Sequence, residues 1–365
     1  MKILQVIDSL ALGGAEVLTA SLYAGLLKRG LFCEYYLLRS EQTPLERKLA
    51  DSGARIHAPL RASVYSPRHL RAFRETLRRF KFDVVHVHLF PAQLWAACGA
   101  WAARGATPLI TTEHNTENRR RTYWLRGIDR WMYGRYRRIA SISPATTKQL
   151  VAWLPELQSK IADCPNGIDV ETFASASGPG KQALFSVTED TPVILCVGRL
   201  EMVKDHETLL RAMSSIPRAV LALAGDGPLR RPLHALAEQL GIGSRVQFLG
   251  KRADVPQLLK AADLYVQPSR WEGLSIAVLE AMAAGKPIVV SDAPSLAEQV
   301  EDTALLFPVG DAHQLALRIS TLLADPHLRQ QLACLAQQRA RMFGLERTLD
   351  CYERLYRDVA RKAEQ

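Results

Sequence analysis

Short apolar runs rich in β-branched and aromatic residues alternate with longer amphipathic stretches along the whole chain. Runs of this kind predict buried strands, and the stretches between them predict helices or loops. In the first half the predicted strands are residues 3–7, 32–38, 84–88, 109–112 and 139–142, and after residue 180 the pattern restarts with strands at 193–197, 219–224, 246–249, 264–267 and 288–290. The alternation indicates an α/β protein with two doubly wound parallel sheets.

The restart of the pattern also predicts two domains, because 365 residues exceed what one ordinary core accommodates. We expect a first domain over residues 1–174 and a second over residues 185–345. The small, polar stretch around Gly178-Pro179-Gly180 is typical of a linker between them. An apolar stripe from Leu349 to Val359 predicts a C-terminal helix, and periodicity alone does not say which domain it covers. The cleft between two such domains is the predicted binding site.

Composition narrows the class of protein further. An apolar content of 48% is typical of a globular chain rather than a disordered one. The six cysteines form no C-x-x-C pair and no zinc spacing, so we expect no disulfides and a reducing compartment such as the cytoplasm. The uncharged run at residues 89–103 is shorter than a membrane-spanning helix. The chain is therefore expected to be soluble, or at most peripheral on the cytoplasmic face of a membrane.

The net charge of +10 is concentrated in the first half. Residues 68–82 carry six basic residues against one acid, as an exposed helix face does, and residues 118–138 carry eight arginines against one aspartate. The second segment interleaves its arginines with Tyr123, Trp124 and Trp131. This composition suits an anionic membrane surface or a nucleic acid, but it equally suits a solvated helix whose aromatic side chains face the core.

Two carboxylates stand in the otherwise apolar segment RWEGLSIAVLEAMAAGKP, residues 270–287. Its apolar residues would lie almost all round a helix, which predicts a buried helix that ends at Gly285. Glu272 then falls in the turn after a predicted strand and Glu280 inside the helix, roughly 12 Å apart along the axis. A buried carboxylate needs hydrogen-bond donors, and the hydroxyls of a ligand would supply them.

Candidate anion-binding groups follow the strand predicted at residues 193–197. Ligands of open parallel sheets bind at the carboxyl ends of strands, and Arg199 and Lys204 lie just beyond this one. Arginine offers paired donors and lysine a point charge, so we expect the two to hold a diphosphate. The turn Gly273-Leu274-Ser275 would add backbone N–H groups at a helix start, whereas Ser275 could also be a simple helix cap.

The first half carries weaker candidates at its own strand ends. Gly13 and Gly14 lie at a helix start, where glycine permits close approach of a ligand but is also common in tight turns. His114 follows the strand at residues 109–112 and is a candidate to face the cleft. His86 and His88 share one face of a strand, and without an identifiable third ligand we interpret them as hydrogen-bonding groups. The chain holds no Asp-x-Asp, so we expect no metal.

These motifs together resemble the retaining glycosyltransferases of family 4. They are GGAE at 13–16, DVVHVH at 83–88, TTEH at 111–114, PNGID at 165–169, VGRLEMVKDHETLL at 197–210, AGDGP at 224–228 and EGLSIAVLEAMAAGKPIVVSD at 272–292. Each piece is common, whereas the series in this order spans nearly the whole chain and is specific. The resemblance implies the GT-B fold: two facing Rossmann-like domains with parallel sheets and an interdomain cleft, and a last helix, residues 346–365, that rejoins the first domain.

The resemblance also assigns roles. It implies that Glu272 contacts the donor hexose and Glu280 the ribose, and that Arg199 and Lys204 hold the diphosphate. It also implies that Gly14 and His114 approach the sugar from the first domain. The groups expected at the donor are Gly13, Gly14, Arg199, Lys204, Glu272, Gly273, Leu274, Ser275 and Glu280, and those expected in catalysis are Glu272, His114, Arg199 and Lys204. We expect metal-independent transfer with retention, and we expect no cofactor beyond the donor substrate. Where many relatives have glycines after the strand ending in SD, this chain has Ala293-Pro294-Ser295.

The expected partners are a UDP-, GDP- or ADP-sugar as donor, a glycan or lipid-linked acceptor, and an anionic membrane surface at residues 118–138. Three other functions compete with transfer. A sugar-nucleotide epimerase would release nucleotide without an acceptor, and a silent binder would turn nothing over. A basic nucleic-acid-binding protein would explain the arginines but neither Glu272 nor Glu280, so we expect no nucleic acid partner.

Overall fold

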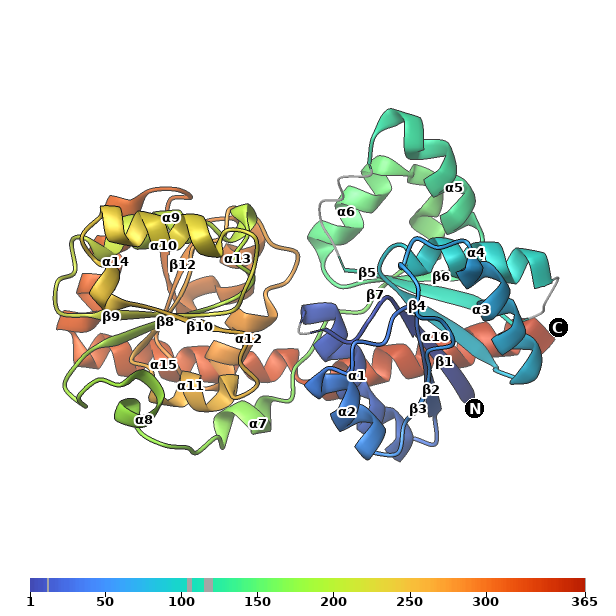
Figure 1. The fold of residues 1–365 in the computed structure, drawn as a ribbon, viewed down its shortest axis with the longest axis horizontal. Helices are drawn as coiled ribbons and strands as arrows, with labels where there is room; N and C mark the ends of the chain where they lie inside the picture. The colour runs from blue at the N-terminus through green and yellow to red at the C-terminus, as the bar shows by residue number, and fades with distance from the viewer. Residues whose placement is uncertain (12, 104–106, 115–120, 365) are drawn as a thin grey trace. The chain divides into compact units, whose positions relative to one another are not determined.

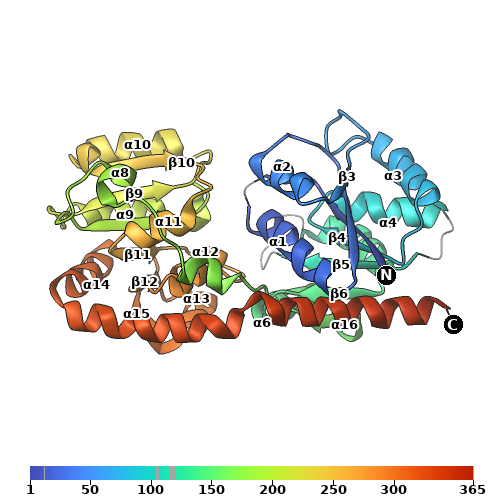
Figure 2. The same ribbon diagram turned by 90° about the horizontal axis from the view of Figure 1, so that it is seen from below.

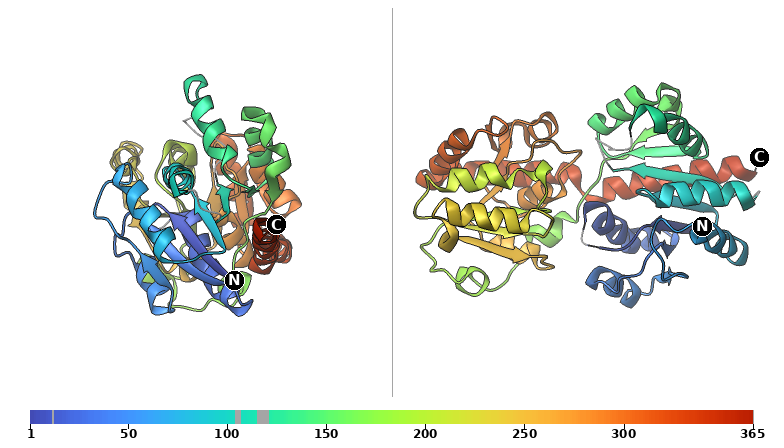
Figure 3. Two further views of the ribbon diagram at one scale, coloured as in Figure 1. Left: turned by 90° about the vertical axis from the view of Figure 1, so that its right-hand side faces the viewer. Right: turned by 45° about the horizontal axis from the view of Figure 1, so that its top comes forward.

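The computed structural model describes residues 1–11, 13–103, 107–114 and 121–364, which form two compact units. Unit 1 comprises Met1–Gly167 and Leu345–Gln365, and unit 2 comprises Ile168–Gly344. Each unit contains one parallel sheet with helices on both faces (Figures 1 and 3). The predicted class, α/β with two Rossmann-like sheets, is confirmed.

Unit 1 is built on a seven-stranded sheet in the order β3-β2-β1-β4-β5-β6-β7. Its strands are β1 (Lys2–Ile7), β2 (Phe32–Leu37), β3 (Arg55–His57), β4 (Val84–His88), β5 (Leu109–Glu113), β6 (Arg138–Ser141) and β7 (Ile161–Asp163). Its helices are α1 (Gly14–Lys28), α2 (Pro44–Asp51), α3 (Arg68–Arg79), α4 (Ala92–Ala103), α5 (Arg126–Gly134), α6 (Pro144–Trp153) and α16 (Leu345–Glu364), with 3-10 turns η1 (Tyr123–Leu125) and η2 (Pro155–Lys160).

The two faces of this sheet bury separate apolar clusters. Leu22 and Leu26 of α1 pack with α16 against Ile3 of β1 on one face, and Ala96 of α4 and Met132 of α5 pack against Val85 of β4 on the other. Because successive residues of a strand point to opposite faces, near-continuous apolar strands such as β1 and β4 serve both clusters. All strands run parallel, so their carboxyl ends lie along a single edge.

The predicted C-terminal stripe belongs to unit 1. Helix α16 lies beside α1 (Figure 2). Its Leu349, Tyr352 and Tyr356 are buried in the same cluster as α1. Gly25 of α1 makes the contact close, since a Cβ at that position would lie 2.3 Å from Leu349 Cδ1. Arg29, just after α1, forms ion pairs with Glu346 and two further carboxylates of α16. The apolar stripe and these charges hold α16 on unit 1.

The expectation of no disulfides is wrong for this structure. Cys164, which follows β7, is bonded to Cys351 of α16, with 5.7 Å between their Cα atoms, an ordinary separation for a disulfide. The two residues are 187 positions apart, and no local motif marks them as partners. The pairing arises because α16 crosses back over unit 1 beside the end of β7. Reasoning from cysteine spacing could not detect it.

Unit 2 is built on a six-stranded sheet in the order β10-β9-β8-β11-β12-β13. Its strands are β8 (Val193–Val197), β9 (Val220–Ala224), β10 (Val246–Gly250), β11 (Leu264–Gln267), β12 (Ile288–Ser291) and β13 (Leu305–Phe307). Its helices are α7 (Val170–Ala174), α8 (Lys181–Phe185), α9 (His206–Met213), α10 (Arg230–Gln239), α11 (Val255–Ala261), α12 (Ile276–Ala283), α13 (Pro294–Val300), α14 (Ala312–Ala324) and α15 (Pro326–Ala340), with 3-10 turns η3 (Met202–Lys204), η4 (Gly243–Arg245), η5 (Glu301–Thr303) and η6 (Arg341–Phe343).

The boundary between the units differs from the one predicted. The first unit ends at Gly167 rather than at residue 174, because Phe173 of α7 is buried in the core of unit 2. The stretch predicted as a linker also belongs to unit 2. There Phe185 of α8 is buried in the same core, and Lys181 forms an ion pair with Asp263 at 2.8 Å. One large apolar side chain anchors a segment whose composition is otherwise typical of a linker.

Of the helices described, none has both the length and the apolar content needed to cross a lipid bilayer.

Candidate active site

The loop after β8 is held against the β9 end by close backbone contacts. Gly198 N–H donates to the Ala224 carbonyl at 2.9 Å, and Leu200 N–H donates to the Asp226 carbonyl at 3.2 Å. Lys204 lies in η3, at the end of this loop, and its side chain passes over Gly198, where an added Cβ would lie 3.6 Å from Lys204 Cε. The two strand ends thus place the Lys204 ammonium at the carboxyl edge of the sheet.

Lys204 and Glu272 form the central ion pair of the site. Lys204 Nζ lies 2.5 Å from Glu272 Oε1, and the two side chains are only 19% and 11% exposed. Ser269 Oγ donates to the same carboxylate oxygen at 2.7 Å. An ammonium has three N–H donors, so one ion pair leaves Lys204 able to donate to a ligand as well. The structure therefore brings together these two predicted residues, which are distant in the sequence.

Helix α12 begins and ends as predicted, with Glu272 in the turn before it and Glu280 within it. Gly285, at a φ of +66°, ends the helix in the left-handed conformation that favours glycine. Ser275 stands at the N-cap position, yet its side chain caps no backbone N–H group. Its buried Oγ has no hydrogen-bond partner among the residues described here. The cap interpretation of Ser275 is therefore wrong, and its hydroxyl remains free for a ligand.

Glu280 is a partly buried carboxyl group on α12. Burial raises its pKa to about 8, so that the protonated form predominates at neutral pH. Within the described parts of the chain, no side chain or backbone donor is hydrogen-bonded to its carboxylate oxygens. Ligand hydroxyls that donate to the carboxylate would favour the ionised form and lower this pKa.

Arg199 does not contact the Lys204–Glu272 pair within the described residues. Its guanidinium is 65% exposed and forms an ion pair with Glu201 at 2.7 Å. Arg199 follows β8 directly, so it lies at the same edge of the sheet as Lys204, but the structure shows no direct contact of its side chain with the Lys204–Glu272 pair in the described residues. Its predicted contact with a diphosphate remains a prediction.

Unit 1 carries the remaining predicted residues at its own carboxyl edge. Gly13 is the N-cap residue of α1 and Gly14 is the first residue of that helix, after β1. An added Cβ on Gly13 would lie 2.4 Å from Glu16 Oε2, so the missing side chain makes room for the Glu16 carboxylate. His114 follows β5 and is partly buried.

His114 is the outer end of a buried hydrogen-bonded chain. His114 Nε2 lies 3.1 Å from His88 Nδ1, and His88 Nε2 lies 2.9 Å from Gln5 Oε1. Gln5 Nε2 donates to the Tyr356 hydroxyl at 3.0 Å, and that hydroxyl lies 2.8 Å from His86 Nδ1. The interpretation of His86 and His88 as hydrogen-bonding residues agrees with these contacts. The chain ties His114 to α16.

The direction of this hydrogen-bonded chain determines which ring nitrogen of His114 carries the proton. Burial lowers the pKa values of His86 and His88 well below the usual range and that of His114 to about 4, so all three rings are neutral at pH 7. Gln5 Oε1 can only accept, so His88 carries its proton on Nε2 and accepts at Nδ1. His114 therefore donates from Nε2. Its Nδ1 keeps a lone pair, which can accept a hydrogen bond from a substrate hydroxyl.

Sequence reasoning missed the residues that support Glu272 and Ser275. Gln299 of α13 holds the Ser275 backbone, accepting from its N–H at 2.9 Å and donating to its carbonyl at 2.8 Å. Ser295 Oγ donates to the Glu272 carbonyl at 2.8 Å. Ser295 belongs to the Ala293-Pro294-Ser295 departure, which here forms the start of α13. The polar Ser295, at a position where many relatives have glycine, was a signal in the sequence. The sequence does not show which group Ser295 contacts.

The basic segment divides into a buried and an exposed face. Met132 and Tyr133 of α5 are buried in the core of unit 1, whereas Trp124 is 86% exposed, Tyr123 79% and Trp131 36%. Arg135 stacks over the exposed Trp131, 5.2 Å from its ring centre. The buried residues fit the interpretation as a helix whose aromatic side chains face the core, and binding of an anionic surface by the exposed ones stays a prediction. Residues 118–120 lie outside the described residues.

Two family profiles match the chain, one in each half. The family described as Glycosyltransferase Family 4 matches residues 12–172, and the family described as Glycosyl transferases group 1 matches residues 183–339. Taken together, the two matches show that the chain belongs to these glycosyltransferase families. Both matches include predicted site residues, namely His114 in the first and the Lys204–Glu272 pair in the second.

Relatives and solved structures agree with this assignment. The glycosyltransferase is 31% identical to the lipopolysaccharide core biosynthesis glycosyltransferase LpsE of Rhizobium meliloti over 51% of this chain and 57% of LpsE, so this match spans little more than half of LpsE. It is 27% identical to the UDP-Gal:alpha-D-GlcNAc-diphosphoundecaprenol alpha-1,3-galactosyltransferase of Escherichia coli over 70% of each chain. Its fold matches that of Anabaena HepE, solved in complex with UDP-glucose, with a TM-score of 0.85 and 23% identity over 97% of this chain and 99% of HepE. The glycosyltransferase has the GT-B fold.

Among the described residues, no group of three or more His, Cys, Asp or Glu side chains is arranged to hold a metal ion.

Proposed function

We propose that this glycosyltransferase moves a hexose from a nucleoside-diphosphate sugar to a glycan or lipid-linked acceptor, with retention of anomeric configuration and without a metal ion. The Lys204–Glu272 pair carries the proposal. It places a cation and a carboxylate 2.5 Å apart at the carboxyl edge of a parallel sheet. The helix that follows carries a second acid, Glu280, to which no donor among the described residues is hydrogen-bonded. A sugar nucleotide offers a diphosphate for the first and hydroxyls for the two acids.

The proposed chemistry breaks the bond between the anomeric carbon and the donor phosphate oxygen. The departing phosphate gains negative charge, which the Lys204 ammonium and the N-terminal end of α12 stabilise. The acceptor hydroxyl attacks from the same face of the sugar, and the leaving phosphate oxygen takes its proton. Glu272 accepts hydrogen bonds from hexose hydroxyls and fixes the ring, while Glu280 does the same for the ribose. No protein nucleophile enters the reaction.

The comparisons support particular donors and acceptors. HepE was solved with UDP-glucose, and the Escherichia coli relative is named for a UDP-linked galactose and a diphosphoundecaprenol acceptor. LpsE is named for lipopolysaccharide core biosynthesis. We therefore propose a UDP-hexose as the first donor to test and an envelope glycan, free or lipid-linked, as acceptor. His114, with a free Nδ1, is proposed to accept a hydrogen bond from the donor sugar.

A donor screen tests this function. One of the UDP-, GDP- or ADP-sugars should raise the melting temperature of the protein. At a ligand concentration a hundredfold above Kd, the unfolding free energy should rise by about 2.7 kcal/mol. With an acceptor present, proton NMR of the product should show the same anomeric configuration as the donor, and EDTA should leave the rate unchanged. An inverted product, or release of a free nucleotide and an epimerised sugar without acceptor, would refute the proposal.

We also propose that the exposed aromatic face of residues 121–138 docks on an anionic bilayer that carries the acceptor. The exposed Tyr123 and Trp124 offer large amphipathic surfaces, and the exposed Arg135 bears the complementary charge for acidic lipids. The buried side of the same segment, through Met132 and Tyr133, fixes that face to the core of unit 1.

Vesicle flotation tests this docking. The double substitution Trp124→Ala and Trp131→Ala should lower the fraction of protein that floats with vesicles of acidic phospholipid by at least about threefold, because each aromatic ring removed takes away interfacial contact area. Tyr65→Ala, at a site 66% exposed elsewhere in unit 1, is the matched control and should float as the wild type does. Equal flotation of the double variant would contradict the proposal.

A further inference from the structure

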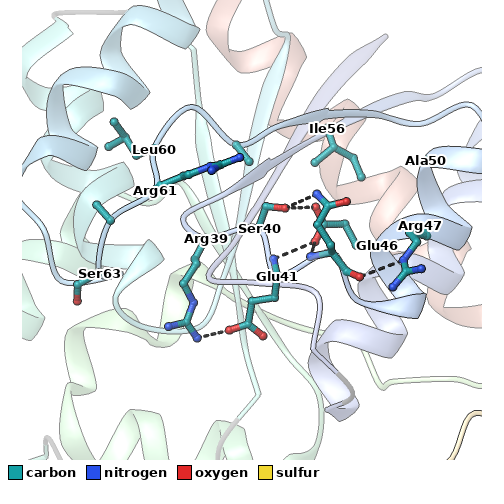
Figure 4. A pocket seen from close by; sticks show the side chains of 13 residues that line it. Arg39, Ser40, Glu41, Glu46, Arg47, Ala50, Ile56, Leu60, Arg61 and Ser63 are labelled. Atoms are coloured by element: carbon teal, nitrogen blue, oxygen red, sulfur yellow. Dashed lines mark hydrogen bonds and ion pairs between the residues drawn. The ribbon is translucent and has the colours of Figure 1, made fainter.

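A pocket of about 940 Å³ opens at the carboxyl ends of β2 and β3 in unit 1 (Figure 4). It lies away from every residue assigned above, and its lining includes Arg39, Arg47 and Arg61. The loop on one side follows β2, and the loop on the other follows β3. Polar residues beyond strand ends are where ligands of such sheets bind, so the pocket is a candidate site in its own right.

Two of the three arginines keep N–H groups for a ligand. Arg47 uses its Nε to donate to the Gln42 carbonyl at 3.1 Å, which leaves its two terminal nitrogens. Arg61 forms no hydrogen bond or ion pair with any of the residues that the structure describes. Arg39 is paired with Glu41 (Figure 4). A guanidinium with free terminal nitrogens matches the oxygens of a phosphate.

The two carboxylates of the pocket are occupied by the protein itself. Glu46 is only 5% exposed and accepts hydrogen bonds from Ser40 Oγ at 2.5 Å and from the backbone N–H groups of Glu41 and Gln42 at 3.2 and 3.0 Å. Its oxygens therefore hold the loop rather than face a ligand, and the Glu41 carboxylate is bound to Arg39. The charge that a ligand meets is dominated by Arg47 and Arg61.

Part of the remaining lining is apolar. Ala50 of α2, Ile56 of β3, and Leu60 beyond it form aliphatic surface beside the arginines (Figure 4). A bare inorganic ion would leave this surface unused. A sugar ring presents C–H groups on its faces, which pack on aliphatic side chains, while its phosphate substituent reaches the guanidinium groups.

The pocket is linked to the sugar-binding edge of unit 1. Arg39 N–H donates to the Asp8 carbonyl at 2.9 Å, and Thr43 Oγ1 donates to the Leu10 carbonyl, so the pocket loop is bonded to the segment that leads to Gly13. In the sheet, β2 and β5 are three strand spacings apart, which places the pocket roughly 14 Å from the end of β5 where His114 lies. That distance spans more than one sugar residue.

We propose that this pocket binds a phosphorylated sugar of the acceptor, at a residue distinct from the one that carries the reacting hydroxyl. The inference rests on the proposed glycosyl transfer and specifies its substrate class: an oligosaccharide that bears a phosphate monoester. An earlier reaction, a phosphoryl transfer to that sugar, must then supply the acceptor.

NMR of the full chain labelled with ¹⁵N-arginine tests the site directly. Glucose 6-phosphate, inorganic phosphate and glucose serve as probes at constant ionic strength. We expect the Nε–H signal of Arg61, assigned by its loss in Arg61→Gln, to shift saturably with glucose 6-phosphate. Inorganic phosphate should bind at least about tenfold more weakly, and glucose should leave the signal unmoved. Because the readout is local to Arg61, phosphate that binds near Lys204 does not mimic it.

Two variants distinguish binding in this pocket from nonspecific attraction of phosphate to positive charge. Arg47→Gln should weaken glucose 6-phosphate binding at Arg61 at least about tenfold, whereas Arg71→Gln, at an 87% exposed guanidinium on α3, should leave it unchanged. An unmoved Arg61 signal, or an equal response to glucose, would overturn the proposal. Melting shifts with sugar nucleotides on the same sample report the proposed function separately. A chain that binds the donor but shows no Arg61 response refutes only this inference.

Discussion

Lys204→Ala should lower the rate of sugar transfer by at least roughly a hundredfold while the protein stays folded at the assay temperature. The ammonium forms an ion pair with Glu272. In the proposed reaction it neutralises the charge that develops on the departing phosphate. Removal of one preorganised donor of this kind typically costs about two to three orders of magnitude in rate. Steady-state release of nucleoside diphosphate, with donor and acceptor both saturating, measures the effect on kcat.

The same substitution removes the Lys204 ammonium from the Glu272 carboxylate. Since both side chains are mostly buried, unfolding free energy should fall by about 2 kcal/mol, and Glu272→Gln should partly restore the stability of Lys204→Ala because an amide is cheaper to bury than a charge. Lys260→Ala, an exposed lysine on α11, is the control and should change neither activity nor melting. Wild-type turnover in both Lys204→Ala and Glu272→Ala would show that the site is elsewhere.

Gly225→Ala should reduce the unfolding free energy of the protein by about 3 to 4 kcal/mol, the largest loss we expect from a single methyl group. Gly225 follows β9 at a φ of +147°, and a Cβ there would lie 1.8 Å from the Gly198 carbonyl oxygen. That oxygen is backbone, so relief requires the loop that carries Arg199 and Lys204 to move. Thermal melting should fall by about 10 °C, and the affinity for the donor should weaken with it.

Gly241→Ala distinguishes the cost of the clash with the Gly198 carbonyl from the cost of backbone strain at a positive φ. Gly241 also lies in unit 2 and also has a positive φ, +68°, but a Cβ there would meet no atom within 4 Å. It should cost only about 1 kcal/mol, from backbone strain alone, and should not change donor binding. If Gly225→Ala melted no lower than Gly241→Ala, the close approach of the β9 end to the β8 loop would be refuted.

The central strands of both sheets could be predicted because they are apolar on both faces. β4, β8 and β11 occur at the residues predicted, since helices cover both faces of the sheet and burial makes the strands continuous runs of apolar residues. The three-residue strands β3, β7 and β13 were missed. Each pairs on one side only, at or near a sheet edge, and its partly exposed residues show no pattern that distinguishes it from a loop.

The candidate site shows the same division. Glu272 and Lys204 could be selected from residue type and position beyond strand ends, because all strands of a parallel sheet end at the same edge. Glu280 could be selected as an acid within an otherwise apolar helix. The pairing of Lys204 with Glu272 at 2.5 Å could not be selected, nor could the support from Ser269 and Gln299. Each of these contacts joins different strands or helices, whose side chains meet only when the loops adopt one conformation.

The sequence by itself determined the class of fold, the number of sheets and the positions of most strand ends, because these depend on burial patterns that are local and repeat along the chain. Only the tertiary structure decided which distant side chains share a proton or a charge. The Cys164–Cys351 disulfide and the hydrogen-bonded chain from His114 to Tyr356 join segments far apart in sequence, and the arginine pocket beyond β2 needs two loops to meet. The physical reason is that such contacts depend on ångström-scale packing between elements, to which hydrophobic periodicity is insensitive.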